Sequence, residues 1–122
     1  MDFCDVYLGG KPIAKGVRYC GSFRLKLLGL MFVKRPGAGA FLPDVRDIHM
    51  NFVNFELRVI WLDNKFRVVD DKIAKRWKLY NGPRDASHVL ELPISNRTKL
   101  KTGDTLKIIV YEENNKTKKK RR

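Results

Sequence analysis

Four side chains could bind a soft metal ion: Cys4, Cys20, His49 and His88. Structural zinc sites usually draw their ligands in close pairs, such as two cysteines or two histidines a few residues apart. No such pair occurs in this sequence, which therefore favours neither a zinc site nor any other cofactor. We expect two buried free thiols, with a disulfide as the alternative because both cysteines lie near one expected β-hairpin.

Residues that could catalyse hydrolysis do not form a recognisable set. The sequence has no G-x-S-x-G turn of the kind that presents a nucleophilic serine. Ser87 and His88 are adjacent, which in a strand points them to opposite faces and prevents a direct pair. Glu91 and Asp104 could act as paired carboxylates, yet each also fits a turn or a solvent-facing position. The sequence therefore favours a noncatalytic protein.

Excess positive charge is the strongest compositional signal. The 122 residues include 26 Lys and Arg against 13 Asp and Glu, a formal charge of +13. Residues 116–122 hold six of the basic groups, which leaves +7 on the rest. Such a chain binds polyanions such as RNA or DNA, if only nonspecifically, and six tail charges on duplex phosphates would give a salt slope of roughly −5. The candidate polyanion-binding residues are Lys116, Lys118, Lys119, Lys120, Arg121 and Arg122.

A second basic segment, residues 75–80, interleaves aromatic and positively charged side chains in the order KRWKLY. Such a pattern could stack bases while neutralising phosphates. The alternative is that Trp77 and Tyr80 anchor the core while the lysines face solvent.

The elements that must position these residues are mostly strands. Short runs of β-branched and aromatic residues recur about every ten residues, with turn residues between them. Turns at residues 9–10 and 63–64 are expected to close two β-hairpins. Residues 22–28 fit a short helix that Ser22 could cap, but Phe23, Leu25 and Leu27 also alternate as in a strand, and residues 70–82 are open in the same way. The fold class is mainly β, a compact antiparallel barrel or sandwich of about seven short strands with one short helix.

One β-rich domain is expected over residues 1–111, followed by a basic, disordered tail over residues 112–122. The longest apolar runs fall far below the ~20 residues that cross a bilayer, and the first residues do not resemble a secretory signal. The sequence thus predicts a cytoplasmic protein without a membrane span, and it leaves the oligomeric state open. A charged fraction of 32% is compatible with a thermophilic source.

Five short motifs follow one another in a distinctive order: GLMF at 29–32, IHM at 48–50, WLD at 61–63, VLELP at 89–93 and GD at 103–104. With these spacings the chain resembles the family catalogued as domain of unknown function 192, and its IHM variant resembles the archaeal branch. The resemblance covers residues 17–111 and implies a small, mostly β domain with a short helix before GLMF and no established activity. Glu56 and Arg58 replace the family's usual Pro and Asp, so no site that needs that carboxylate is expected.

The same resemblance implies a candidate ligand site. Alternation in VLELP turns Glu91 away from Leu90 and Leu92, toward solvent or a polar pocket. In a pocket, Glu91 would be the best candidate for a functional carboxylate. The sequence predicts an uncharacterised binding domain for an unknown small ligand, with polyanion binding as the alternative and an unrecognised enzyme as the second alternative. The candidate ligand-binding residues are Met31, His49, Met50, Glu91 and Asp104, with Gly29 and Gly103 as backbone-geometry positions.

Overall fold

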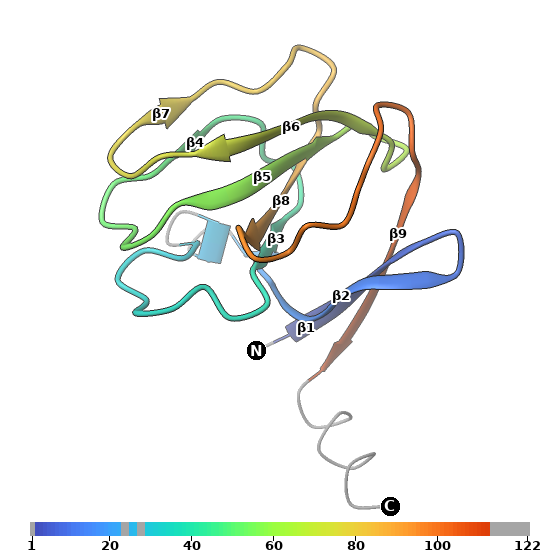
Figure 1. The fold of residues 1–122 in the computed structure, drawn as a ribbon, viewed down its shortest axis with the longest axis horizontal. Coiled ribbons are helices and arrows are strands. Elements are labelled where there is room, and N and C mark those ends of the chain that lie inside the picture. The colour runs from blue at the N-terminus through green and yellow to red at the C-terminus, as the bar shows by residue number, and fades with distance from the viewer. Residues whose placement is uncertain (1, 23–24, 27–28, 113–122) are drawn as a thin grey trace, which may run out of the picture.

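A strongly twisted β-sheet organises the molecule, as the computed structural model shows for residues 2–22, 25–26 and 29–112 (Figure 1). Seven strands form it in the order β6-β5-β8-β3-β2-β1-β9, and β4 pairs with β7 in a separate small sheet. The strands are β1 (Asp2–Leu8), β2 (Lys11–Tyr19), β3 (Ala40–Leu42), β4 (Ile48–His49), β5 (Leu57–Leu62), β6 (Val68–Ala74), β7 (Leu79–Tyr80), β8 (His88–Pro93) and β9 (Leu106–Glu112). The mainly β fold class is confirmed.

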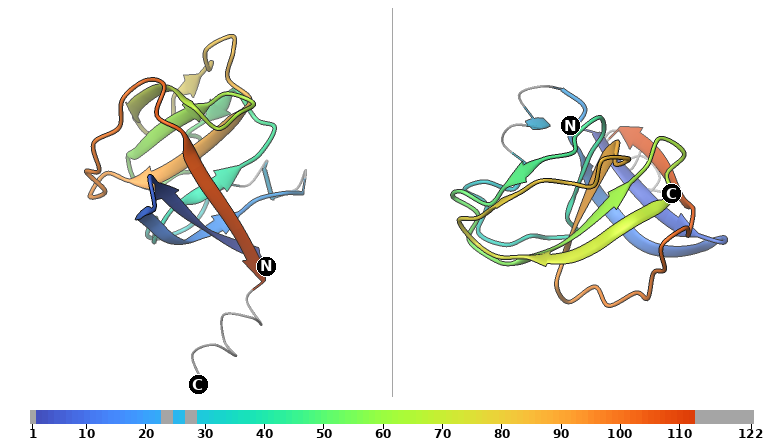
Figure 2. Two further views of the ribbon diagram at one scale, coloured as in Figure 1. Left: turned by 90° about the vertical axis from the view of Figure 1, so that its right-hand side faces the viewer. Right: turned by 90° about the horizontal axis from the view of Figure 1, so that it is seen from above.

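The large sheet curls but does not close into a barrel. Its neighbouring strands run antiparallel except for the parallel pair β2 and β3. The start of β6 meets the start of β9 at an isolated bridge between Arg67 and Thr105 and through a few backbone hydrogen bonds beside it, but the two edge strands form no continuous ladder among the described residues. Figure 2 shows the resulting sandwich-like arrangement, with the β5–β6 side stacked beside β1, β2 and β9. Of the two expected architectures, the open sandwich is therefore the correct one.

The first hairpin forms at the expected glycine pair. Gly9 and Gly10 have φ angles of 57° and 82°, and they connect Leu8 directly to its partner Lys11. Two successive positive φ angles match the right-handed twist of the flanking strands, and glycine adopts them without steric cost. The hairpin prediction for β1 and β2 is confirmed.

The second hairpin joins β5 to β6 through a turn held by Asp63. Its Oδ1 accepts hydrogen bonds from the backbone N–H groups of Lys65 and Arg67, each at 2.9 Å. These side-chain hydrogen bonds stabilise the turn, where the backbone N–H groups have no partner in the strand ladder. The segment 70–82, which fitted either a helix or a strand, begins as the end of strand β6. This strand continues to Ala74 because pairing with β5 satisfies its backbone hydrogen-bonding groups.

The central strands β5 and β8 are buried on both faces, which explains their nearly continuous apolar sequences. One face of the sheet packs a core that includes Val59, Trp61 and Val89, and the other packs a core that includes Ile60 and Leu90. A strand covered on two sides carries apolar residues at successive positions. These two cores set the position of every side chain on β8, including Glu91.

The segment expected as a short helix lies largely outside the described residues, which omit 23, 24, 27 and 28. The described part shows backbone hydrogen bonds from Lys26 to Ser22 at 2.9 Å and from Gly29 to Leu25 at 2.8 Å. Ser22 Oγ also accepts a bond from the Leu25 N–H at 3.1 Å, as an N-terminal cap does. Both backbone bonds have the i to i+4 spacing of an α-helix, and Gly29 follows in a turn.

The last two expectations were a basic C-terminal tail and the lack of a membrane-spanning segment. The basic tail beyond Glu112 lies outside the described residues, as do the six candidate polyanion-binding positions within it. Within the described ranges, no helix has the length and apolar character needed to cross a bilayer.

Candidate functional site

A cavity of about 320 Å³ lies against the face of the sheet formed by β3 and β8. Its wall combines that face with the segment after the helical turn and the stretch from β3 to the residues beyond β4. Most of the lining is apolar, with a few polar groups among it. The lining residues are Lys26, Gly29, Leu30, Met31, Leu42, Asp44, Val45, Asp47, Ile48, His49, Val53 and Glu91.

Glu91 is placed in the cavity by its position in the middle of β8. It pairs with Ala40 of β3 on one side and Val59 of β5 on the other. Since alternate residues of a strand share a face, Glu91 lies on the same face as Val89, opposite Leu90 and Leu92. Glu91 therefore points away from the two leucines, as predicted, and faces the cavity.

Burial gives the Glu91 carboxyl unusual chemistry. The residue is 5% exposed, and no described residue makes a hydrogen bond or ion pair with its carboxyl group. Removing water from a carboxylate without replacing its hydrogen bonds disfavours the charged form, and this raises the pKa of Glu91 to about 7. The carboxyl can therefore change its charge near neutral pH.

Two of the predicted positions lie beside Glu91 in the cavity wall. Gly29 has a φ of 48°, and a Cβ at this position would lie 3.8 Å from Glu91 Oε1. Met31 lines the cavity two residues further on. His49, half-buried on β4, lines it from another side, with Nδ1 accepting a 3.3 Å hydrogen bond from the Asn51 N–H. The structure thus brings Gly29, Met31, His49 and Glu91 together.

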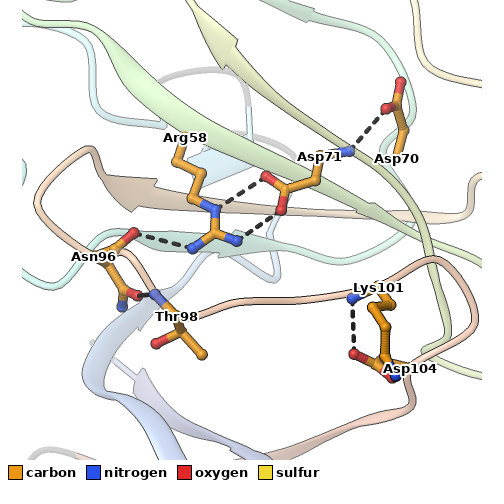
Figure 3. Close-up of polar contacts among 7 residues, drawn as sticks. All are labelled: Arg58, Asp70, Asp71, Asn96, Thr98, Lys101 and Asp104. Carbon is orange, nitrogen blue, oxygen red and sulfur yellow. Dashed lines mark hydrogen bonds and ion pairs between the residues drawn. The ribbon is translucent and has the colours of Figure 1, made fainter.

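The remaining predicted positions lie elsewhere. Met50 is fully buried in the core and does not line the cavity. Asp104 accepts a 2.8 Å hydrogen bond from the Lys101 N–H in the turn before β9 (Figure 3). Gly103, with a φ of 97°, donates its N–H to the Val68 carbonyl in the same turn. Asp104 and Gly103 therefore organise a turn outside the cavity.

Arg58 forms a polar network on the opposite face of the sheet, away from Glu91. Its guanidinium makes two bonds to the Asp71 carboxylate, at 3.0 and 2.7 Å, and a third to the Asn96 carbonyl at 3.0 Å (Figure 3). Bidentate pairing of this kind satisfies both charged groups in fixed geometry. Asn96 in turn donates to the Ile13 carbonyl at 2.9 Å, so Arg58 connects β5 to β6 and to the loop after β8.

Three polar residues of the cavity wall were not predicted from the sequence: Lys26, Asp44 and Asp47. Asp44 follows β3 and has a φ of 57°, and Asp47 accepts a 3.1 Å hydrogen bond from the Gly82 N–H. The available signal was a pair of aspartates in the loop that follows the short apolar segment 40–42. With Glu91, these residues give the wall three carboxyl groups against one lysine, in a strongly basic chain.

The thiols and imidazoles considered as metal ligands do not converge. Over the described ranges, no group of three or more His, Cys, Asp and Glu side chains could hold a metal ion. Cys4 and Cys20 are buried and free, as predicted, and burial raises their pKa values to about 12 and about 11. His88 Nδ1 accepts a 3.0 Å hydrogen bond from the Asp44 N–H, and its ring stacks on Phe66 with centroids 4.7 Å apart.

Comparison with known proteins identifies several relatives of this chain. No family model matches it. A UPF0127 protein of Thermococcus kodakarensis is 34% identical over 115 residues, which cover 88% of this chain and 73% of that protein. The chain belongs to the UPF0127 family. A family member from Pyrococcus horikoshii is 35% identical over 98 residues, covering 75% of this chain and 85% of that protein.

The fold is shared with a solved structure. A protein of unknown function from Novosphingobium aromaticivorans superposes with a TM-score of 0.70 at 19% identity, covering 86% of this chain and 83% of that one. The UPF0127 relatives come from archaeal thermophiles and are themselves uncharacterised. The family is thus one of conserved small β-domain proteins of unknown function, as the motifs led us to expect.

Proposed function

We propose that this UPF0127 protein is a noncatalytic binding domain whose cavity takes a small organic amine. One observation carries the proposal: Glu91, 5% exposed and without a partner among the described residues, lines a cavity of about 320 Å³. A buried carboxylate without hydrogen bonds is costly, and a protonated amine is the group that relieves that cost most directly.

The rest of the wall supports the same ligand class. A volume near the lower end of ligand pockets suits a small molecule. Leu30, Leu42 and Val53 supply apolar contact for a hydrocarbon body. Asp44 and Asp47 add negative charge, which is opposed by Lys26 in the wall and by Arg46, whose guanidinium lies 3.4 Å from the Asp47 carboxylate. A short aliphatic chain ending in an ammonium group matches both features.

A titration with matched probes tests this proposal. We would measure binding of n-butylamine, n-butanol and butyrate by calorimetry to the wild type, to Glu91→Gln, and to Glu56→Gln as an exposed control. The amine should bind best to the wild type and to Glu56→Gln, more tightly as the pH rises through about 7, and at least tenfold more weakly to Glu91→Gln. Equal affinity for amine and butyrate, or an unaffected Glu91→Gln variant, would contradict the proposal.

Two finer assignments accompany this one. We propose that UPF0127 and domain of unknown function 192 describe the same family, supported by the order and spacing of the five motifs. We also propose a cytoplasmic location, supported by the two free thiols at buried positions.

A further inference from the structure

Three large aromatic side chains form an exposed cluster on the surface. Phe32, Phe52 and Trp77 are 65%, 48% and 54% exposed. The rings of Phe32 and Phe52 stack with centroids 5.0 Å apart, and Trp77 meets Phe52 edge-on at 5.1 Å. Aromatic residues usually bury their rings, so three contacting rings left in solvent indicate a binding surface. We call these three residues the aromatic cluster.

The three residues of the aromatic cluster have a strained backbone conformation, which fixes the direction of their rings. Phe32, Phe52 and Trp77 have φ angles of 63°, 60° and 67°, a left-handed conformation that bulky side chains avoid. Hydrogen bonds hold them there: the Phe32 N–H donates to the Phe52 carbonyl and the Trp77 N–H to the Met50 carbonyl, both at 2.9 Å. Strain of this kind concentrates at functional sites, and here it presents preorganised rings.

The chain segments that carry the three rings hold basic residues and no acidic ones. The segments 30–35, 50–54 and 75–79, which carry the three rings, contain no aspartate or glutamate. Arg76 Nε donates a 3.1 Å hydrogen bond to the Val53 carbonyl, which ties the Trp77 segment to the Phe52 segment. Five exposed basic residues flank the rings in sequence: Lys34, Arg35, Lys75, Arg76 and Lys78.

The aromatic cluster is separate from the Glu91 cavity although the same loops build both. Met31 and Val53 face the cavity, whereas their chain neighbours Phe32 and Phe52 are exposed to solvent. The two sites can therefore be tested independently, because the rings can be removed without altering a cavity-lining side chain.

We propose that the aromatic cluster and its flanking cations bind single-stranded nucleic acid. Bases stack on aromatic faces with little sequence preference, and the cations neutralise the phosphates between them. In a duplex the base faces are stacked on one another, so they are not available to the aromatic rings. An uncharged protein partner would leave the five basic residues beside the rings without counterions. Charge complementarity thus selects an unpaired polyanion that carries flat rings.

The test compares ring removal with charge removal in the full chain. We would measure anisotropy of a labelled oligo-dT with the wild type, Phe32→Asn, Trp77→Asn, Lys75→Gln and, as a control on β9, Ile109→Asn. Asparagine tolerates the left-handed backbone, so the first two variants remove rings without new strain. Each should weaken binding about tenfold with the salt slope unchanged, because stacking is nonionic. Lys75→Gln should lower the slope by about 0.7, and Ile109→Asn should bind like the wild type.

The basic residues of 116–122 would also bind phosphates, so their contribution is measured in a separate set of titrations. The titrations are repeated with the six basic residues of 116–122 replaced by glutamine, which lowers nonspecific binding but should preserve the ratio between wild-type and ring variants. Wild-type affinity in both ring variants, equal affinity for duplex and single strand, or a ring effect seen only on anionic phosphatidylserine vesicles would overturn the proposal.

Discussion

Gly39 lies directly against the backbone of Glu91. A Cβ on Gly39 would overlap the Glu91 carbonyl oxygen and lie 3.0 Å from the carbonyl carbon. Gly39 also has a φ of 108°, and its carbonyl accepts a 3.1 Å hydrogen bond from the Arg18 N–H. The absence of a side chain at residue 39 therefore lets the start of β3 approach β8 at the residue that lines the cavity.

Substituting Gly39 should destabilise the protein strongly. Gly39→Ala introduces both a backbone clash and a disfavoured φ, and we expect a loss of about 3 kcal/mol or more in the free energy of unfolding. Gly37→Ala is the matched control in the same loop, because its φ is 58° but nothing lies within 4 Å of the added carbon. We expect about 1 kcal/mol there. Urea denaturation measures both, and equal losses would refute the close approach.

Glu91 should make stability depend on pH near neutrality. Its folded pKa of about 7 exceeds the ordinary value of 4.5, so the folded state binds the proton more tightly than the unfolded chain. The stability from this protonation is complete below about pH 4.5 and is lost as the pH rises through 7, a total of about 3 kcal/mol.

The variant Glu91→Gln removes that titration while keeping the side-chain volume. Its free energy of unfolding, measured by denaturant titration between pH 4 and 8 in a common buffer, should match the wild type at the acid end and exceed it by about 3 kcal/mol at the alkaline end. Glu56→Gln, at an exposed glutamate, should track the wild type at every pH. A constant difference between Glu91→Gln and wild type would show that the carboxyl is not perturbed.

Removing Asp71 should cost more than removing a surface charge. Arg58 is 8% exposed, and Asp71→Ala would leave its guanidinium with only the Asn96 carbonyl (Figure 3). Because Asp71 is partly solvated, we expect a loss of about 2 kcal/mol, below the range for fully buried pairs. Lys72→Ala breaks a partly exposed 3.5 Å pair with Asp70 and a 5.8 Å contact of Lys72 Nζ with the Trp61 ring, and it should cost about 1 kcal/mol or less. Thermal unfolding of both variants compares them, and similar costs would mean that burial adds nothing to the Arg58 pair.

The two cysteines should be inert in the folded protein. Burial raises the pKa of Cys4 to about 12 and that of Cys20 to about 11, so the reactive thiolate is scarce at neutral pH. Ellman's reagent should therefore release no signal from the native protein and two equivalents after denaturation. Rapid release of one equivalent under native conditions would show that a thiol is accessible.

Local sequence signals determined the hairpins, the mainly β class and the orientation of Glu91. Each depends on neighbours along the chain: two glycines adopt adjacent positive φ angles in a turn, and alternation in VLELP separates Glu91 from Leu90 and Leu92. The family resemblance added Gly29, Met31 and His49, which the structure brings to the same cavity as Glu91.

Only the tertiary structure decided which candidates meet. Met50 and Asp104 belong to the same motif set as Glu91, yet one is fully buried in the core and the other supports a turn, because pairing between distant strands sets their surroundings. The aromatic cluster also joins three segments that are far apart in the sequence. Thus the sequence by itself determined the two hairpins, the mainly β class and the face on which Glu91 lies, whereas packing between distant strands created its cavity and, by burying the carboxyl, moved its pKa toward neutrality.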